Sequence, residues 1–475
     1  MSELHHLTIA EAGRLYRARK LSPVELTQAY LDRIEALDGA LRSYLLVTAD
    51  RALTEAKTAE AELMAGTDRG PMHGIPYGLK DVYETEGVRT TCNSKILLNH
   101  VPKTDSEVQR RLRQGGGVLL GKQALWEFTY GGPPYDLPWQ PALNPWDRNR
   151  ALMGSSTGSG AAIAAGLCPG AMGSDTGGSI RSPAALCGIA GLKPTYGRIS
   201  RAGVFPNTYS FDSCGPMAWT SEDCALMLQA VAGYDPKDPA SFDEPVEDYA
   251  RALGGSLKGK RIGLIRDWYE VEGKDAVSDD MRRAMENAIE VFRSLGCEVR
   301  DIKIPSMREF LDCKVPITLA ELYAAYEREL KDRPQDFGKS FRFRVMPGVL
   351  IRGSDYVNAV RWRTILTTET LAHFNDIDLM LTLGYLGEPP KVVPDEKPAM
   401  LNATVPSITT PFNLTGQPTL TVCCGYASDG FPIGMQIAGK PFDEAGVLAA
   451  GHAFETATQD GRRRPTIEVK ESATV

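Results

Sequence analysis

Apolar side chains recur with a helical period near the start of the chain. Within residues 22–39 they gather on one helix face, at Leu26, Tyr30, Ile34 and Leu37. Ser22 is placed to cap this helix, with Pro23 in the first helical position and Glu25 as the capping-box partner. Gly39 then predicts the end of the helix. This pattern indicates packing rather than chemistry.

The pattern changes between residues 71 and 235, where short apolar runs are cut by glycine, proline, serine and threonine. Such runs are typical of buried strands whose connecting loops carry function. Residues 261–304 then predict a strand, a helix capped by Ser278 and a second strand after Gly296. Residues 305–375 have a helical pattern. The chain therefore predicts an α/β fold with its active site in the segment 71–235.

Composition narrows the classes of function. The 475 residues are 43% hydrophobic and 24% charged, with a net charge of −7 and no basic stripe, so we expect no nucleic acid partner. No apolar run approaches the roughly 20 residues of a membrane helix, so we expect no membrane. Nine cysteines without a C-x-x-C pair favour the reducing cytoplasm, and six scattered histidines lack ligand spacing. We expect no metal and no cofactor.

The stretch "GSDTGGSIRSP", residues 173–183, has the composition of a nucleophile loop. Ser179 follows two glycines, which let backbone N–H groups face a cavity without a Cβ. An oxyanion hole is therefore predicted at Thr176, Gly177, Gly178 and Ser179. No histidine is near in the sequence. Lys80 lies in an apolar segment shaped by glycine and proline, where desolvation would lower its pKa and make it a general base. Asp175 is expected to brace the loop.

A second serine offers an alternative nucleophile. The stretch "GSSTG", residues 154–158, matches the G-x-S-x-G elbow around Ser156, with Asp378 and His452 as later partners. An elbow joins a strand to a helix, whereas the preceding "NPWDRNRALM" has the composition of a loop and His452 falls in a predicted helix. The context therefore disfavours this alternative.

Five ordered motifs together resemble the amidase signature family of serine hydrolases. They are "GIPYGLKD", "GKQALWEF", "NPWD", "GSDTGGSIRSPA" and "GLKPTYGRIS". The resemblance implies a Ser-Ser-Lys triad, with Ser179 as nucleophile, Lys80 as base and Ser155 as a relay reached through a cis peptide. It also implies a large mixed β-sheet covered by helices on both sides.

The resemblance covers most of the chain and implies a single domain over residues 1–475. Helices are expected within 1–70, the catalytic core within 71–235, a more variable α/β and helical region within 236–400, and a return to the core within 401–475.

Two features suggest the shape of the substrate pocket. Where the family usually reads G-G-S-S-G-G-S, the chain has "MGSSTGS", so Met153 and Thr157 are expected to reshape the pocket wall. The loop 129–140 carries Tyr130, Tyr135 and Trp139, which favour an apolar or aromatic substrate group if they face the pocket. The alternative is that these aromatic rings only pack the loop.

The preferred function is a serine amidohydrolase acting on small, apolar or aromatic amides, with ureas, esters and carbamates as further substrates and a homodimer as an open option. The alternative is the glutaminase subunit of a tRNA-dependent amidotransferase, which needs partner subunits. Ala124 and Trp126 interrupt the motif common in that glutaminase and favour the stand-alone enzyme. A third alternative is a catalytically inactive binding relative.

Overall fold

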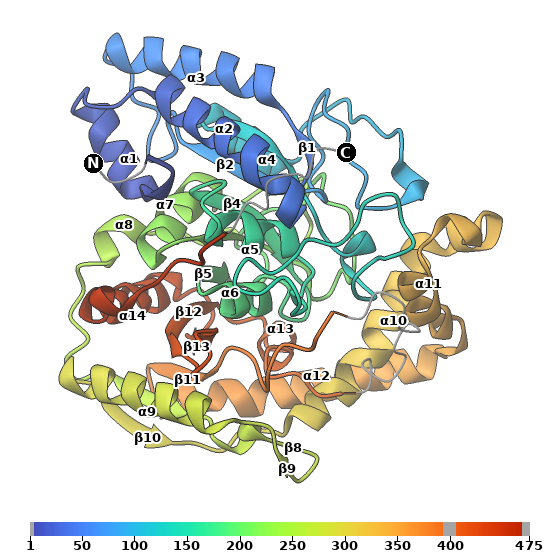
Figure 1. Cartoon of the computed structure of the whole chain (residues 1–475). Coiled ribbons are helices and arrows are strands. Elements are labelled where there is room, and N and C mark those ends of the chain that lie inside the picture. The colour runs from blue at the N-terminus through green and yellow to red at the C-terminus, as the bar shows by residue number, and fades with distance from the viewer. Residues whose placement is uncertain (1–3, 393–404, 468–475) are drawn as a thin grey trace.

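An eleven-stranded mixed sheet runs through the centre of the protein (Figure 1). The computed structural model describes residues 4–392 and 405–467. The strands of this sheet are β1 (Tyr44–Val47), β2 (Pro76–Lys80), β3 (Val118–Gln123), β4 (Gly170–Asp175), β5 (Ala190–Lys193), β6 (Ser213–Ala218), β7 (Arg261–Leu264), β10 (Glu298–Asp301), β11 (Leu379–Leu383), β12 (Thr419–Tyr426) and β13 (Pro432–Ala438). They lie side by side in the order β1-β3-β2-β4-β6-β5-β12-β13-β11-β7-β10. A separate pair of short strands is formed by β8 (Glu270–Val271) and β9 (Lys274–Asp275).

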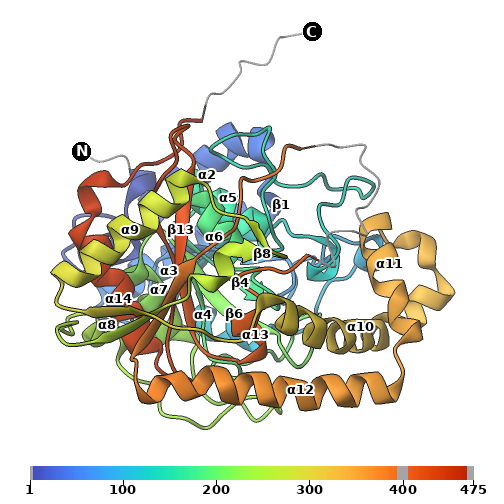
Figure 2. The ribbon, with the colours of Figure 1, turned by 90° about the horizontal axis from the view of Figure 1, so that it is seen from below.

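Helices cover both faces of the sheet, with α5 and α6 on one side and α7 and α14 on the other (Figure 2). The helices are α1 (Ile9–Arg17), α2 (Pro23–Leu41), α3 (Ala49–Met64), α4 (Glu107–Gln114), α5 (Thr157–Ala164), α6 (Arg181–Cys187), α7 (Ser221–Val231), α8 (Tyr249–Ala252), α9 (Asp279–Ser294), α10 (Met307–Asp332), α11 (Lys339–Val345), α12 (Gly353–Ala372), α13 (Pro411–Leu414) and α14 (Glu444–Ala457). The predicted α/β architecture is confirmed.

Strand direction determines where the site lies. β2 runs parallel to both of its neighbours, β3 and β4. Every residue of these three strands is buried, as expected for parallel strands covered on both faces. Lys80 is the last residue of β2 and Asp175 the last of β4. Because parallel strands end at the same edge of a sheet, the two residues and the loops that follow them come together.

Helix α2 begins where the sequence predicts it. The Ser22 hydroxyl accepts the N–H groups of Val24 and Glu25, although the reciprocal bond of a capping box is not formed. The predicted end at Gly39 is wrong by two residues. Leu41 is fully buried and prolongs the helix, and Arg42 then takes the left-handed conformation that terminates it.

The segment 261–304 forms the predicted strand, helix and strand as β7, α9 and β10, with β7 and β10 paired in parallel. Residues 305–375 are helical as expected, and α10, α11 and α12 form a layer of their own at one side of the molecule (Figures 1 and 2). The large sheet contains strands from β1, which begins at residue 44, to β13, which ends at residue 438, while the expected division into a single domain with four segments stays a prediction. Within the described part of the chain, no helix has both the length and the apolar character needed to cross a bilayer.

Candidate active site

Lys80 occupies the centre of the candidate site. It is fully buried at the end of β2. Its Nζ lies 2.7 Å from Ser155 Oγ and 2.9 Å from Ser174 Oγ, with the Ser174 carbonyl oxygen 3.3 Å away. The amine therefore has short contacts with two hydroxyl groups and no water-exposed surface.

Burial changes the protonation of this amine. Desolvation lowers the pKa of Lys80 to about 7, because water no longer stabilises the ammonium form, and the negative charge of Asp175 opposes the shift only in part. A neutral Lys80 can accept a proton from Ser155 near neutral pH. The geometry thus suits a general base and its first hydroxyl partner.

Ser155 lies in the turn before α5, next to the loop that carries Ser179. The Gly154–Ser155 peptide is cis, and the Ser155 side chain is fully buried just before α5 begins. The Trp126 N–H donates to the Ser155 carbonyl at 3.3 Å, and the Ser156 N–H donates to the Ser179 carbonyl at 3.1 Å. The first bond ties the Ser155 segment to the residues after β3, and the second holds it against the loop that carries Ser179.

Ser179 lies on the wall of a cavity and is partly exposed. Its hydroxyl makes no hydrogen bond with the described residues, and neither do the N–H groups of Thr176, Gly177 and Ser179. The Gly178 N–H, in contrast, donates to Asp175 Oδ1 at 2.7 Å. Of the four predicted oxyanion donors, three are therefore open to a ligand and one already has an acceptor.

The backbone at Gly178 requires glycine. Its φ is +117°, and a Cβ at this position would collide with Thr409 Oγ1. The same Thr409 hydroxyl donates to the Gly177 carbonyl at 2.8 Å. The loop is therefore fixed by packing on one side and by a hydrogen bond on the other.

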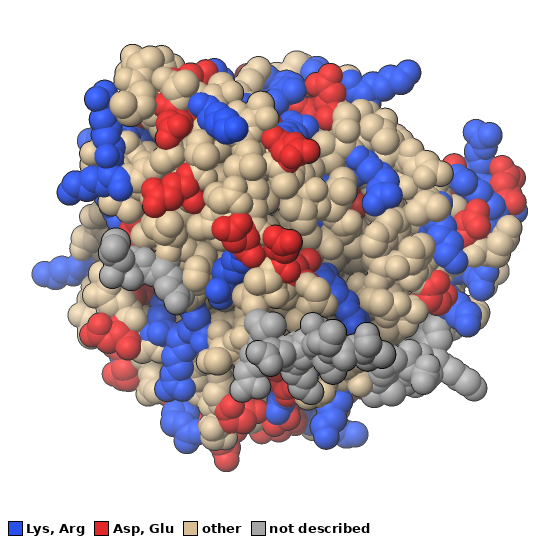
Figure 3. All heavy atoms as spheres, turned by 45° about the horizontal axis from the view of Figure 1, so that its top comes forward, with Lys and Arg blue, Asp and Glu red and all other residues tan. Residues whose placement is uncertain are grey.

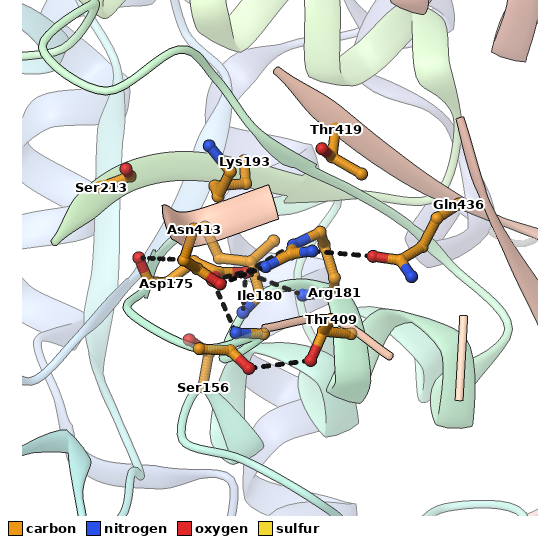
Figure 4. A network of polar contacts seen from close by, with 12 residues as sticks. Ser156, Asp175, Ile180, Arg181, Lys193, Ser213, Thr409, Asn413, Thr419 and Gln436 are labelled. Carbon is orange, nitrogen blue, oxygen red and sulfur yellow. Dashed lines mark hydrogen bonds and ion pairs between the residues drawn. The ribbon is translucent and has the colours of Figure 1, made fainter. Parts of the chain in front are cut away.

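A buried ionic network anchors the nucleophile loop to distant strands (Figure 4). Asp175 accepts from Arg181 Nε and Nη2, both at 3.1 Å, and from Asn413 Nδ2 at 2.8 Å. Arg181 also donates to Gln436 Oε1 on β13 at 2.7 Å. Although desolvation alone would raise it, the Arg181 guanidinium holds the pKa of Asp175 well below its usual range. The bracing role expected for Asp175 has this physical basis.

The alternative nucleophile Ser156 has a structural role here. Its hydroxyl donates to the Ser174 carbonyl at 3.2 Å and accepts the Ser174 N–H at 3.3 Å. His452 lies in α14, and Asp378 pairs with Arg261 at 3.3 Å, so neither contacts Ser156. No strand of the described chain leads directly into this turn. The described residues therefore do not form the elbow triad.

The cavity beside Ser179 has a volume of about 370 Å³. Three of the five predicted pocket residues line it, namely Tyr130, Tyr135 and Met153. Trp139 and Thr157 are not among the lining residues. The Trp139 ring lies against the Arg89 guanidinium, 5.8 Å from ring centroid to the carbon, and the Thr157 hydroxyl points to the Ala124 carbonyl at 3.4 Å inside the protein.

One wall of the cavity, supplied by the α10–α12 layer, was not predicted from the sequence. Leu311, Lys314 and Thr318 line the cavity from one face of α10, and Arg344 lines it from α11. A faint signal existed, because Lys314 shares the helix face of buried Leu311 and Thr318 at spacings of three and four residues. A single lysine in a helix is nevertheless ordinarily a solvated one.

The chain is similar to known proteins along nearly its whole length. The family model described as Amidase matches residues 25–448. The chain is 40% identical to the A-type subunit of glutamyl-tRNA(Gln) amidotransferase from Geobacter metallireducens, over 96% of this chain and 98% of that protein. It is similar, with a TM-score of 0.87 and 32% identity over 97% of this chain and all of the other, to a chain solved in "An unexpected vestigial protein complex reveals the evolutionary origins of an s-triazine catabolic enzyme". Native peptide amidase from Stenotrophomonas maltophilia is also similar, with a TM-score of 0.84 and 29% identity over 98% of this chain and 99% of that one.

These relatives correct one expectation. From the sequence we expected a small-molecule amide, urea, ester or carbamate substrate, no nucleic acid and no membrane, with a homodimer as an open option. The expectation of a small-molecule substrate without nucleic acid is wrong. The curated relatives are named as one subunit of an enzyme that is itself named for a tRNA. Basic and acidic side chains are interspersed on the face in Figure 3. The missing basic stripe therefore did not exclude a relationship to an enzyme named for a tRNA.

Proposed function

We propose a function from the premise that the chain belongs to the amidase signature family, whose members are hydrolases of carbon–nitrogen bonds. The proposed activity is the amide-hydrolysing step of a tRNA-dependent amidotransferase. The chain is then the glutaminase-type subunit, which releases ammonia from a donor amide while partner subunits bind glutamyl-tRNA(Gln). Similarity to A-type amidotransferase subunits along nearly the whole of both chains supports the assembly. The contact of Lys80 Nζ with Ser155 Oγ at 2.7 Å, beside Ser179, is the observation that carries the chemistry.

The proposed mechanism uses three side chains. Ser179 Oγ attacks the amide carbonyl carbon, its proton passes to Ser155 Oγ, and the Ser155 proton passes to neutral Lys80. Backbone N–H groups of the loop stabilise the tetrahedral oxyanion. When the C–N bond breaks, the proton returns through Ser155 to the leaving nitrogen, and ammonia departs.

Water completes the cycle. It attacks the acyl group on Ser179, and its proton follows the same path through Ser155 to Lys80. The acid then leaves and Ser179 regains its proton. The inactive-relative alternative is disfavoured because all three side chains are present and the Ser179 hydroxyl has no competing partner among the described residues.

A cytoplasmic location accompanies this proposal, since all nine cysteines are free thiols. The test is complementation of an extract that lacks the glutaminase-type subunit of the amidotransferase. Addition of the chain should restore conversion of glutamyl-tRNA(Gln) to glutaminyl-tRNA(Gln), and Ser179→Ala should not. If the wild-type chain releases ammonia from amides but leaves glutamyl-tRNA(Gln) unchanged, the amidotransferase proposal is wrong while the hydrolytic chemistry stands.

A further inference from the structure

Cations and hydrogen-bond donors gather on the wall of the Ser179 cavity that the α10–α12 layer supplies. Lys314 and Arg344 line this wall, and exposed Lys391 lies at the same cavity. Among the described lining residues there is no aspartate or glutamate. The described part of the cavity is therefore positively charged even though the whole chain carries a net charge of −7.

Among the cations that line the cavity, Lys314 lies against the nucleophile loop. A Cβ added at Gly177 would collide with its Nζ, so the ammonium group lies directly against the backbone of this loop. Lys314 forms no hydrogen bond or ion pair with the residues that the structure describes. Its charge thus lies beside the loop that carries Ser179 without a partner of its own.

Neighbouring charges do not neutralise Lys314. Asp175 is the acid with the largest influence on it, but that carboxylate is already paired with Arg181 (Figure 4). Desolvation lowers the pKa of Lys314 to about 8, and repulsion from Arg181 and Arg344 adds to the shift. An anion in the cavity would relieve this repulsion.

Two further donors in the cavity lack partners. Thr318 is 3% exposed and lies one helical turn after Lys314, and its hydroxyl has no hydrogen-bond partner in the described structure. Trp126 Nε1, a group that can only donate, is buried without a partner among the described residues at the same cavity. Buried donors without acceptors are costly, and a ligand rich in acceptor oxygens would satisfy them.

We propose that Lys314 binds a carboxylate of the donor amide and so selects anionic donors. The inference rests on the proposed amide hydrolysis and deepens it by naming the substrate class. Because the described cavity wall offers no acid to an ammonium group, the site favours a donor that carries a carboxylate alone over one that also carries an amine. Lys314 is then a specificity residue and not part of the proton path through Ser155.

The test compares primary amides that differ in the charge at the far end of a short chain. The donors are glutaramate with a carboxylate, pentanamide with no charge, 5-aminopentanamide with an ammonium group, and L-glutamine with both charges. Ammonia release is measured without tRNA, so the result does not depend on the amidotransferase proposal. For the wild type we expect kcat/KM to fall in the order glutaramate, glutamine, pentanamide, 5-aminopentanamide, with about 10- to 100-fold between glutaramate and pentanamide.

Variants at two lysines of α10, one inside the cavity and one outside it, separate a local from a general effect of charge. Lys314→Met should reduce the preference for glutaramate over pentanamide to within about threefold, chiefly by raising KM for glutaramate. Lys314→Glu should reverse the preference in favour of 5-aminopentanamide. Lys331→Met, a matched change at an exposed lysine of the same helix outside the cavity lining, should leave the preference unchanged because solvent screens that charge.

Several outcomes would overturn the inference. Equal losses on all four donors in Lys314→Met would make Lys314 a structural residue or a stabiliser of the oxyanion. A wild type without preference for glutaramate would remove the anion site. If turnover is too slow to measure, glutaramate should still slow fluorophosphonate labelling of Ser179 in the wild type and not in Lys314→Met, and absence of this protection also counts against the inference.

Discussion

The catalytic edge of the sheet, with Lys80, Ser155 and Ser179, and the α10–α12 layer form two walls of one cavity. The two walls differ in whether their polar groups have hydrogen-bond partners. At the catalytic edge the polar groups satisfy one another, since Lys80 has two serine partners and Asp175 has Arg181 and Asn413. On the α10 wall, Lys314 and Thr318 have no partners among the described residues. Lys80 and the loop that carries the nucleophile are thus held in place by the fold itself, while the α10 wall has polar groups that a substrate would have to satisfy.

The largest effect should come from the nucleophile. Ser179→Ala is expected to reduce ammonia release by about 10³-fold or more and to abolish fluorophosphonate labelling, because the variant lacks the hydroxyl that carries the acyl group. Peptide mapping by mass spectrometry identifies the labelled serine. Ser156→Ala is the control and should still be labelled at Ser179. A label on Ser156 would restore the elbow alternative and contradict the assignment of Ser179 as the nucleophile.

The next effect concerns the ionic anchor of the catalytic edge. Asp175→Asn leaves Arg181 buried without a counter-ion and should lower the free energy of unfolding by about 3–5 kcal/mol, measured by urea denaturation. Asp378→Asn is the matched control, because it removes the partner of a more exposed arginine, Arg261, and should cost much less. Equal losses in both variants would show that the Asp175 network is not a special anchor.

The two lysines should differ in their pH dependence. Lys80 must be neutral to accept a proton, so kcat/KM should rise with pH through about 7 and fall roughly tenfold per pH unit below it. Lys314 must be charged to bind a carboxylate, so kcat/KM for glutaramate should fall again above about 8. For pentanamide, kcat/KM should show only the rise through about pH 7. In Lys314→Met, the fall above about pH 8 should also be lost for glutaramate. If kcat/KM of the wild type for glutaramate does not fall above about pH 8, a charged Lys314 does not bind the carboxylate.

The same linkage applies to stability. The pKa of Lys80 is lower in the folded protein than in the unfolded chain, so the unfolded chain binds more protons between about pH 7 and its ordinary pKa of 10.5. Stability from this group therefore rises with pH across that window. Far-ultraviolet circular dichroism at each pH separates loss of folding from loss of activity.

The catalytic wall could be predicted from the sequence because its chemistry depends on local patterns. Ser179 follows two glycines, and Lys80 ends a buried strand, so residue types and spacing identify them. The assignment of strands and helices succeeded for the same reason. The position of Lys80 next to Ser155, 75 residues away, came from the family resemblance and not from spacing.

The substrate wall could not be predicted in this way. Lys314 reaches Gly177 only because α10 packs over the loop, and no periodicity within α10 reports a contact across 137 residues. Thr157 shows the opposite error. It is next to the active-site turn in the chain, yet its side chain points into the protein toward Ala124. Proximity along the chain was a poor guide to the cavity, because a loop turns successive side chains to different sides.

The smallest effect should separate two aromatic residues of one loop. Tyr130 lines the cavity and packs edge-on against Phe341 of α11, whereas Trp139 lies outside the lining and contacts Arg89. Tyr130→Ala should therefore raise KM for glutaramate by about fivefold or more, since the variant loses both a cavity-lining ring and its contact with α11. Trp139→Ala should change KM and kcat by less than about twofold, because the ring contributes only a cation–π contact with Arg89 outside the cavity. Steady-state kinetics on glutaramate and pentanamide measure both variants, and a larger effect at Trp139 than at Tyr130 would show that Trp139, and not Tyr130, faces the substrate.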